Sequence, residues 1–166
     1  MVVQSHQCKV FMFDPTPKSI EWVKNRKLVE NYVFQPFGID QESKKVDFYL
    51  PLNENFVSGS VQTHKNIDQK RYIKVPMKTL KDIASELGHT KIEILKMDIE
   101  GSEYDVLPSI LESGVSIHQI LIEFHARFFE DGYVKSASAV NLLKHYGYRI
   151  FAISDSFEEI SFIKMQ

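Results

Sequence analysis

Three apolar segments of the sequence end in side chains that can bind a ligand or accept a proton. They end at Asp14, at Asp98 with Glu100, and at Glu123 with His125. Such runs are typical of buried parallel strands, and an open parallel sheet binds ligands beyond the carboxyl ends of its strands. One acid at such a place is equally well explained as a turn or cap residue. Three at the same edge favour a ligand site.

The types of these side chains suit nucleoside binding and proton transfer. A carboxylate has two acceptor oxygens and no donor, so Asp14 could accept both hydroxyls of a ribose, although an Asp-Pro turn explains the same residue. A carboxylate or the imidazole of His125 could take a proton from a reacting hydroxyl; a structural cap is the alternative for His125. Glu103 and Asp105 follow in what we expect to be a first helical turn, where acids are favoured by the helix dipole, and we assign them no site role.

The same acids could also hold a metal ion. Asp98, Glu100, Glu123 and His125 offer hard oxygen ligands with one imidazole, a set that suits Mg²⁺ or Mn²⁺. We expect the side chains of Asp98 and Glu100 to diverge along their extended segment. The sequence therefore predicts no metal site.

The segments that position these residues alternate between strand and helix patterns. Apolar runs at 9–13, 32–38, 92–97 and 119–122 predict strands, and the apolar spacing between most of them is helical. The stretch at about 46–75 predicts a strand-rich excursion from the main sheet.

Helix boundaries are marked by capping residues. Thr16 before Pro17 predicts one N-cap, and Thr79 predicts another. Ser102 is expected to cap a short helix that Pro108 interrupts or restarts.

The C-terminal segments complete the expected fold. The strands expected at 148–153 and 160–164 are joined too tightly for a parallel crossover, so they should pair antiparallel. These features predict an α/β sandwich with a mostly parallel sheet and a C-terminal antiparallel hairpin.

Length and composition restrict the class of protein. A chain of 166 residues is the length of one domain, which we place at 1–166. The net charge of −2 argues against nucleic acid as a partner. No apolar run is long enough to span a membrane. The single Cys8 and the lack of a signal-peptide pattern predict a cytoplasmic location.

Three motifs resemble a known family when taken together. The segment Ile94–Leu107 (ILKMDIEGSEYDVL) resembles the signature of the FkbM-type methyltransferases: a hydrophobic strand, then Lys-hydrophobic-Asp-hydrophobic-Glu-Gly, a small residue and Glu. Phe13–Pro17 (FDPTP) is similar to that family's second-strand segment, and Leu121–His125 (LIEFH) to its fifth-strand segment. The motifs occur in the family's order, and the likeness extends from about residue 9 to 153.

This resemblance implies a fold, a cofactor and a reaction. The fold would be the Rossmann-like class I methyltransferase sandwich, and the cofactor S-adenosylmethionine. The reaction would be methyl transfer to a hydroxyl of a small molecule or sugar. By position, Asp14 would bind the ribose, Gly38-Ile39-Asp40 would lie on the adenine side, and Asp98 would lie beside the methyl donor.

The acceptor pocket would draw on Glu100, Glu123 and His125. The protein would have to orient the acceptor oxygen and manage its proton, because the sulfonium already carries the activated methyl group.

The sequence departs from the family pattern before Lys9. The family has another strand, a glycine-rich turn and a helix there, which need at least ~30 residues, whereas residues 1–8 precede Lys9. We therefore expect an N-terminally truncated domain that binds S-adenosylmethionine very weakly and transfers no methyl group.

The strands ending at Asp14 and Asp98 would flank the missing one. They could pair directly, another chain could fill the gap, or the unpaired edges could make the chain unstable and prone to self-association. The alternative functions are a non-catalytic binding or structural domain and another nucleotide- or sugar-handling α/β enzyme.

Overall fold

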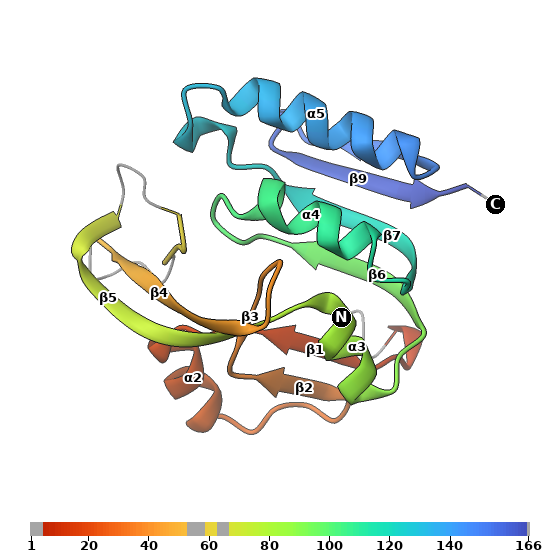
Figure 1. Ribbon diagram of the computed structural model, residues 1–166. Coiled ribbons are helices and arrows are strands. Elements are labelled where there is room, and N and C mark those ends of the chain that lie inside the picture. Colours follow the sequence, from red (N-terminus) through yellow and green to blue (C-terminus); the bar gives the residue numbers. More distant parts are fainter. Residues whose placement is uncertain (1–4, 53–58, 63–66, 166) are drawn as a thin grey trace.

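The computed structural model describes residues 5–52, 59–62 and 67–165 (Figure 1). The strands are β1 (Val10–Phe13), β2 (Tyr32–Gln35), β3 (Gly38–Ile39), β4 (Lys44–Pro51), β5 (Ile67–Lys78), β6 (Lys91–Met97), β7 (Ser116–Glu123), β8 (Tyr148–Ile153) and β9 (Glu159–Lys164). The helices are α2 (Pro17–Lys24), α3 (Leu80–Leu87), α4 (Glu103–Leu111), α5 (Gly132–His145) and the 3₁₀ helix η1 (Ala126–Phe128). The chain is therefore a mixed α/β protein.

The strands form three separate sheets within the described residues. Their orders are β1-β2, β3-β5-β4 and β6-β7-β9-β8. The pairs β1·β2, β3·β5 and β6·β7 are parallel, whereas β4·β5, β7·β9 and β8·β9 are antiparallel. The expected antiparallel pairing of the last two strands is thus confirmed. A mostly parallel sheet is not, because β9 inserts antiparallel between β7 and β8.

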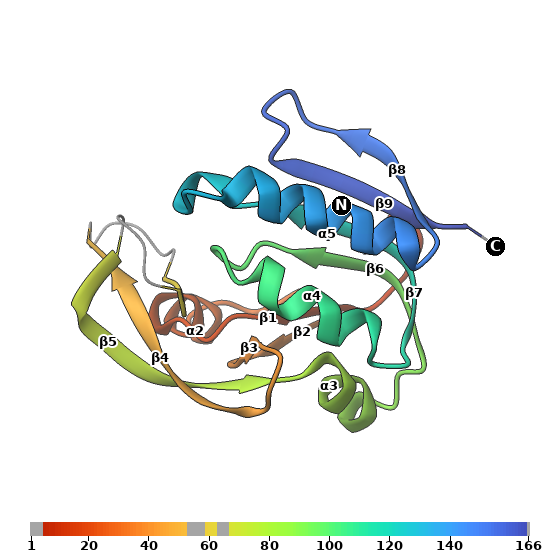
Figure 2. The same cartoon turned by 45° about the horizontal axis from the view of Figure 1, so that its top comes forward.

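The largest core lies under α4 and α5, which cover one face of the sheet β6-β7-β9-β8 (Figures 1 and 2). β7 is an inner strand and buries Ile117, Ile120 and Ile122, while Phe162 of β9 and Leu143 of α5 are fully inaccessible. Burial of an aliphatic or aromatic side chain contributes ~1.5–3 kcal/mol. Most of the described apolar burial therefore lies in this half of the chain.

The N-terminal half is packed more loosely. β1, α2 and β2 contain no fully buried residue. β4 and β5 form a ribbon that extends away from the other sheets (Figure 2). Its buried hydrophobic cluster is small and consists of Phe48, Val75 and Met77.

The strands β1 and β6 lie in different sheets and do not pair along their described residues. Direct pairing of these two strands, one outcome left open by the sequence, is therefore not what the structure shows. A cavity of about 450 Å³ is lined by residues of both, among them Phe11 and Phe13 on one side and Leu95 and Met97 on the other.

Two of the helix starts follow the sequence prediction. The hydroxyl of Thr16 accepts a hydrogen bond from the amide of Ser19, with Pro17 in the first turn of α2. Thr79 accepts one from Asp82 at the start of α3.

Ser102 occupies the expected N-cap position of α4, but the expected capping bond and the expected break at Pro108 are not found. The side chain of Ser102 makes no capping bond, and its buried Oγ has no hydrogen-bond partner among the described residues. α4 continues through Pro108, because Val106, Leu107 and Ile110 on either side of it are completely buried and hold the helix in place. None of the helices described here has the length and hydrophobicity needed to cross a membrane.

Candidate functional site

Parallel pairing of β6 and β7 brings their carboxyl ends together. Met97 at the end of β6 pairs with Ile122 near the end of β7. Asp98 and Glu123, the residues that follow these two, therefore project from adjacent strand ends at one edge of the sheet. His125 follows two residues after Glu123, just before η1.

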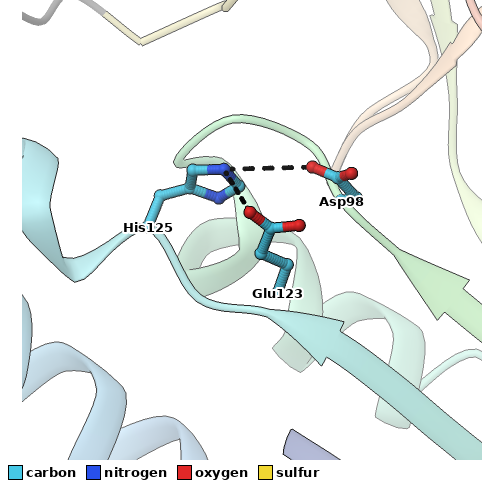
Figure 3. A group of neighbouring side chains, drawn as sticks. All are labelled: Asp98, Glu123 and His125. Atoms are coloured by element: carbon cyan, nitrogen blue, oxygen red, sulfur yellow. Dashed lines mark ion pairs between the residues drawn. The ribbon is translucent and has the colours of Figure 1, made fainter. Parts of the chain in front are cut away.

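The imidazole of His125 is the centre of the site. Its side chain is 1% exposed, and its Nδ1 lies 2.9 Å from Oε1 of Glu103. Its Nε2 faces three carboxylates, at 3.5 Å from Glu100, 3.7 Å from Glu123 and 3.9 Å from Asp98. Figure 3 shows Asp98 and Glu123 approaching this nitrogen from two different strand ends. The four side chains predicted as catalytic thus lie within one cluster.

Glu103 belongs to the same cluster, although the sequence interpretation assigned it no site role. It is fully buried, and its Oε1 accepts hydrogen bonds from the amides of Ile99 and Gly101 as well as contacting His125. Its position in the first turn of α4 gave the wrong interpretation, because an acid there is usually solvated. The signal in the sequence was Gly101, two residues before Glu103. A glycine there permits a tight turn, which brings the Glu103 carboxylate close to the amides of Ile99 and Gly101.

The turn between β6 and α4 directs Glu100 into the site. Glu100 has a φ of 52° and Gly101 a φ of 100°, and the carbonyl of Glu100 accepts a hydrogen bond from the hydroxyl of Ser60 at 2.7 Å. The expected divergence of Asp98 and Glu100 is wrong. Residues two apart in an extended segment share a face, and both side chains reach Nε2 of His125.

The charges around the imidazole perturb two groups. Burial lowers the pKa of His125, but the hydrogen bond and charge of Glu103 and the charge of Glu100 outweigh it, so this pKa lies above its usual value. Burial and the charge of Asp98 raise the pKa of Glu123. The pKa values of both groups are thus raised by their surroundings, and perturbed pKa values are a common property of functional sites.

Asp14 lies on the opposite wall of the cavity between β1 and β6. Its carboxylate accepts hydrogen bonds from the amide of Thr16 at 2.8 Å and the hydroxyl of Ser19 at 2.6 Å, so it stabilises the start of α2. A carboxylate has about four lone-pair positions, and these two hydrogen bonds from described residues use two of them.

The remaining predicted residues divide between the cavity and its surroundings. Gly38, Ile39, Asp98 and Glu100 line the same cavity as Asp14. Asp40 does not; it is 9% exposed, and its carboxylate accepts a hydrogen bond from the amide of Gln41. The structure therefore brings the candidate cofactor and acceptor residues to one region, with Asp40 outside the cavity lining.

A comparison with protein families identifies the chain. The family model described as the methyltransferase FkbM domain matches residues 3–150. The chain belongs to the FkbM methyltransferase domain family. This match covers all three motifs that carried the resemblance in the sequence, and it supports methyltransferase activity.

No curated protein and no solved structure matched the chain. The FkbM domain family is thus the basis for its assignment as a methyltransferase.

Proposed function

We propose that this FkbM domain binds S-adenosylmethionine weakly in the cavity between β1 and β6, at a site arranged for transfer of its methyl group to a hydroxyl of a small molecule or sugar. The convergence of Asp98, Glu100, Glu123 and His125 at the edge of a cavity that Asp14 also lines is the observation that carries the proposal.

The cavity supports a role in cofactor binding. Its volume of about 450 Å³ falls in the range of ~300–1,000 Å³ that is usual for small-ligand pockets. Asp14 at one wall supplies acceptor oxygens for ribose hydroxyls. Asp98 and Glu100 at the other wall supply the negative charge that favours a cationic sulfonium nearby.

The acidic cluster supports a role in handling the acceptor. Methyl transfer forms a carbon–oxygen bond and breaks the sulfur–carbon bond, and the hydroxyl must lose its proton to the protein or solvent. The proton acceptor in this proposal belongs to the set Asp98, Glu100, Glu123 and His125, and Glu103 fixes the orientation of the imidazole.

Cofactor binding is tested by titrating the ¹⁵N-labelled chain with S-adenosylmethionine and following amide chemical shifts. We expect weak, saturable binding that moves the resonances of residues near Asp14 and Asp98 and leaves those at the end of α5 unchanged. Asp14→Asn should weaken binding by about 10- to 100-fold, since a hydrogen bond to a charged group contributes ~1.5–3 kcal/mol. Glu112→Gln, an exposed change of the same kind, serves as the control.

Turnover is tested separately by measuring S-adenosylhomocysteine release with hydroxyl-containing acceptors. Binding without release from any acceptor would favour a non-catalytic domain instead. A titration in which no amide near Asp14 or Asp98 shifts would remove the cavity as the cofactor site.

A further inference from the structure

Asp98, Glu123 and His125, which belong to the set that supplies the proton acceptor in the proposed function, also have the arrangement of a metal site. One ligand-type atom from each, two carboxylate oxygens and a ring nitrogen, lies within 4.8 Å of the others. They come from the ends of two adjacent strands and converge on one small volume (Figure 3). We propose that this volume is a binding site for a divalent cation of the Mn²⁺ or Mg²⁺ type.

The buried imidazole points to a ligand because of how its two nitrogens are used. Nδ1 of His125 contacts the buried carboxylate of Glu103 at 2.9 Å, and a carboxylate can only accept, so this nitrogen carries a proton. In the neutral ring Nε2 then presents its lone pair to the cluster. It makes no hydrogen bond to any described residue, and its three carboxylate neighbours lie at 3.5 Å or more.

A carboxylate that holds the outer nitrogen of a metal-binding histidine is a recurring arrangement in metalloproteins, where it fixes the tautomer and the ring orientation. Glu103 is in this position, and it is itself held by the amides of Ile99 and Gly101. We treat it as a positioning residue.

The three carboxylates around Nε2 of His125 favour positive charge at this position, which either a proton on the ring or a bound cation can supply. Asp98, Glu100 and Glu123 bring only acceptor oxygens. Lys96 lies 3.6 Å from Asp98, and Arg127 lies 3.7 Å from Glu123 while making its shorter contact, 2.7 Å, to Glu158. Like-charged oxygens this close to one another and to a lone pair repel, and a divalent ion among them reverses the sign of these interactions.

The spacing of the atoms fits a small hard cation. Nε2 of His125 lies 3.7 Å from Glu123 and 3.9 Å from Asp98, and ligands ~2.0–2.2 Å from one ion are about 3–4 Å apart. The side chains of Asp98 and Glu123 are 42% and 25% exposed, so both can adjust by small rotations. Two carboxylates with one imidazole and open positions for water suit Mn²⁺ or Mg²⁺.

Binding is tested on the full chain with Mn²⁺, by measuring the decrease of its free electron paramagnetic resonance signal. We expect one site that Mg²⁺ displaces. Asp98→Asn and Glu123→Gln should each weaken Mn²⁺ binding by at least about tenfold, because loss of an outer partner alone costs ~10- to 100-fold. Both side chains are partly exposed, so these isosteric changes leave the core intact, and a melting curve for each variant verifies this. Glu112→Gln is the matched control and should bind as the wild type does.

The identity of the nitrogen ligand is tested with pulsed electron paramagnetic resonance of the bound Mn²⁺. Coupling to an imidazole ¹⁴N nucleus that disappears in His125→Gln is the expected result. Bound Mn²⁺ without this coupling, equal affinity in the Asp98 and Glu123 variants, or no binding at millimolar Mn²⁺ would each overturn the proposal. The measurement needs neither S-adenosylmethionine nor a methyl acceptor, so its outcome is independent of the proposed reaction.

Discussion

Removal of the Glu103 carboxylate should be the most damaging single change near the site. Its Oε1 contacts Nδ1 of His125 at 2.9 Å and accepts hydrogen bonds from the amides of Ile99 at 3.1 Å and Gly101 at 3.2 Å. Each hydrogen bond to a charged group contributes ~1.5–3 kcal/mol. The three share one oxygen, so their sum overstates the loss. Glu103→Ala also leaves His125 buried beside an empty space, and breaking a buried pair in this way costs ~3–5 kcal/mol.

The variant Glu103→Gln separates shape from charge. Its amide oxygen can still accept all three hydrogen bonds, but as a neutral group, so we expect a loss of only ~1–2 kcal/mol. Glu112→Ala, an exposed change at the end of the same helix, should lie within ~0.5 kcal/mol of the wild type.

Urea unfolding followed by far-ultraviolet circular dichroism measures all three free energies. A domain of this kind has a total stability of ~5–15 kcal/mol, so a loss of ~3–5 kcal/mol should lower the Glu103→Ala midpoint by about a fifth or more. If Glu103→Ala costs no more than Glu112→Ala, Glu103 does not hold the turn or the imidazole, and the positioning role is wrong.

The same unfolding assay tests three further contrasts. Thr79→Ala should lower the free energy of unfolding by about 1 kcal/mol, because it removes the helix cap. Ser102→Ala should be neutral or stabilising, because it removes a buried hydroxyl without a described partner. An equal loss in both variants would refute this contrast. Gly132→Ala should destabilise the chain far more than Gly88→Ala. A Cβ at Gly132 would lie 1.9 Å from a carbonyl oxygen, whereas at Gly88 the cost is that of the left-handed backbone conformation, ~1–2 kcal/mol. Similar losses in both variants would contradict the packing at α5. Burial raises the pKa of Tyr148. Its contribution to stability is therefore complete below the pKa of the unfolded tyrosine and is lost as the pH rises through the folded pKa. Tyr148→Phe should reduce the fall in stability between neutral pH and about pH 11, and an unchanged pH profile would contradict this prediction.

The sequence predicted the site best where its residues follow strands that are consecutive along the chain. Asp98, Glu123 and His125 each follow an apolar run, and the parallel pairing of two neighbouring strands was enough to bring them together. Their roles as catalytic residues remain predictions. Glu103 was missed because its burial depends on the left-handed turn at residues 100 and 101 and on a histidine 22 positions later in the chain.

The arrangement of the sheets was less predictable because strand pairing is a long-range property. Hydrophobic periodicity and capping residues predicted most strands and helices correctly. The residues of segment 91–97, however, do not indicate which strand pairs with it. The same applies to Pro108, whose interruption of α4 was expected from the local rule and prevented by the burial of its neighbours. Tertiary packing decided both cases.

The uneven burial of the two halves has a consequence for how a ligand would be held. The acids at the ends of β6 and β7 belong to the well-packed half of the chain. Asp14 lies between β1 and α2, and neither of these elements contains a fully buried residue. Segments with few buried contacts open with a small free energy, well below that of global unfolding. A ligand that spans the cavity would restrict such openings and spend part of its binding free energy on ordering residues 10–35. Amide hydrogen exchange in that segment would then slow on binding, while exchange in the core of β7 and β9 would scarcely change.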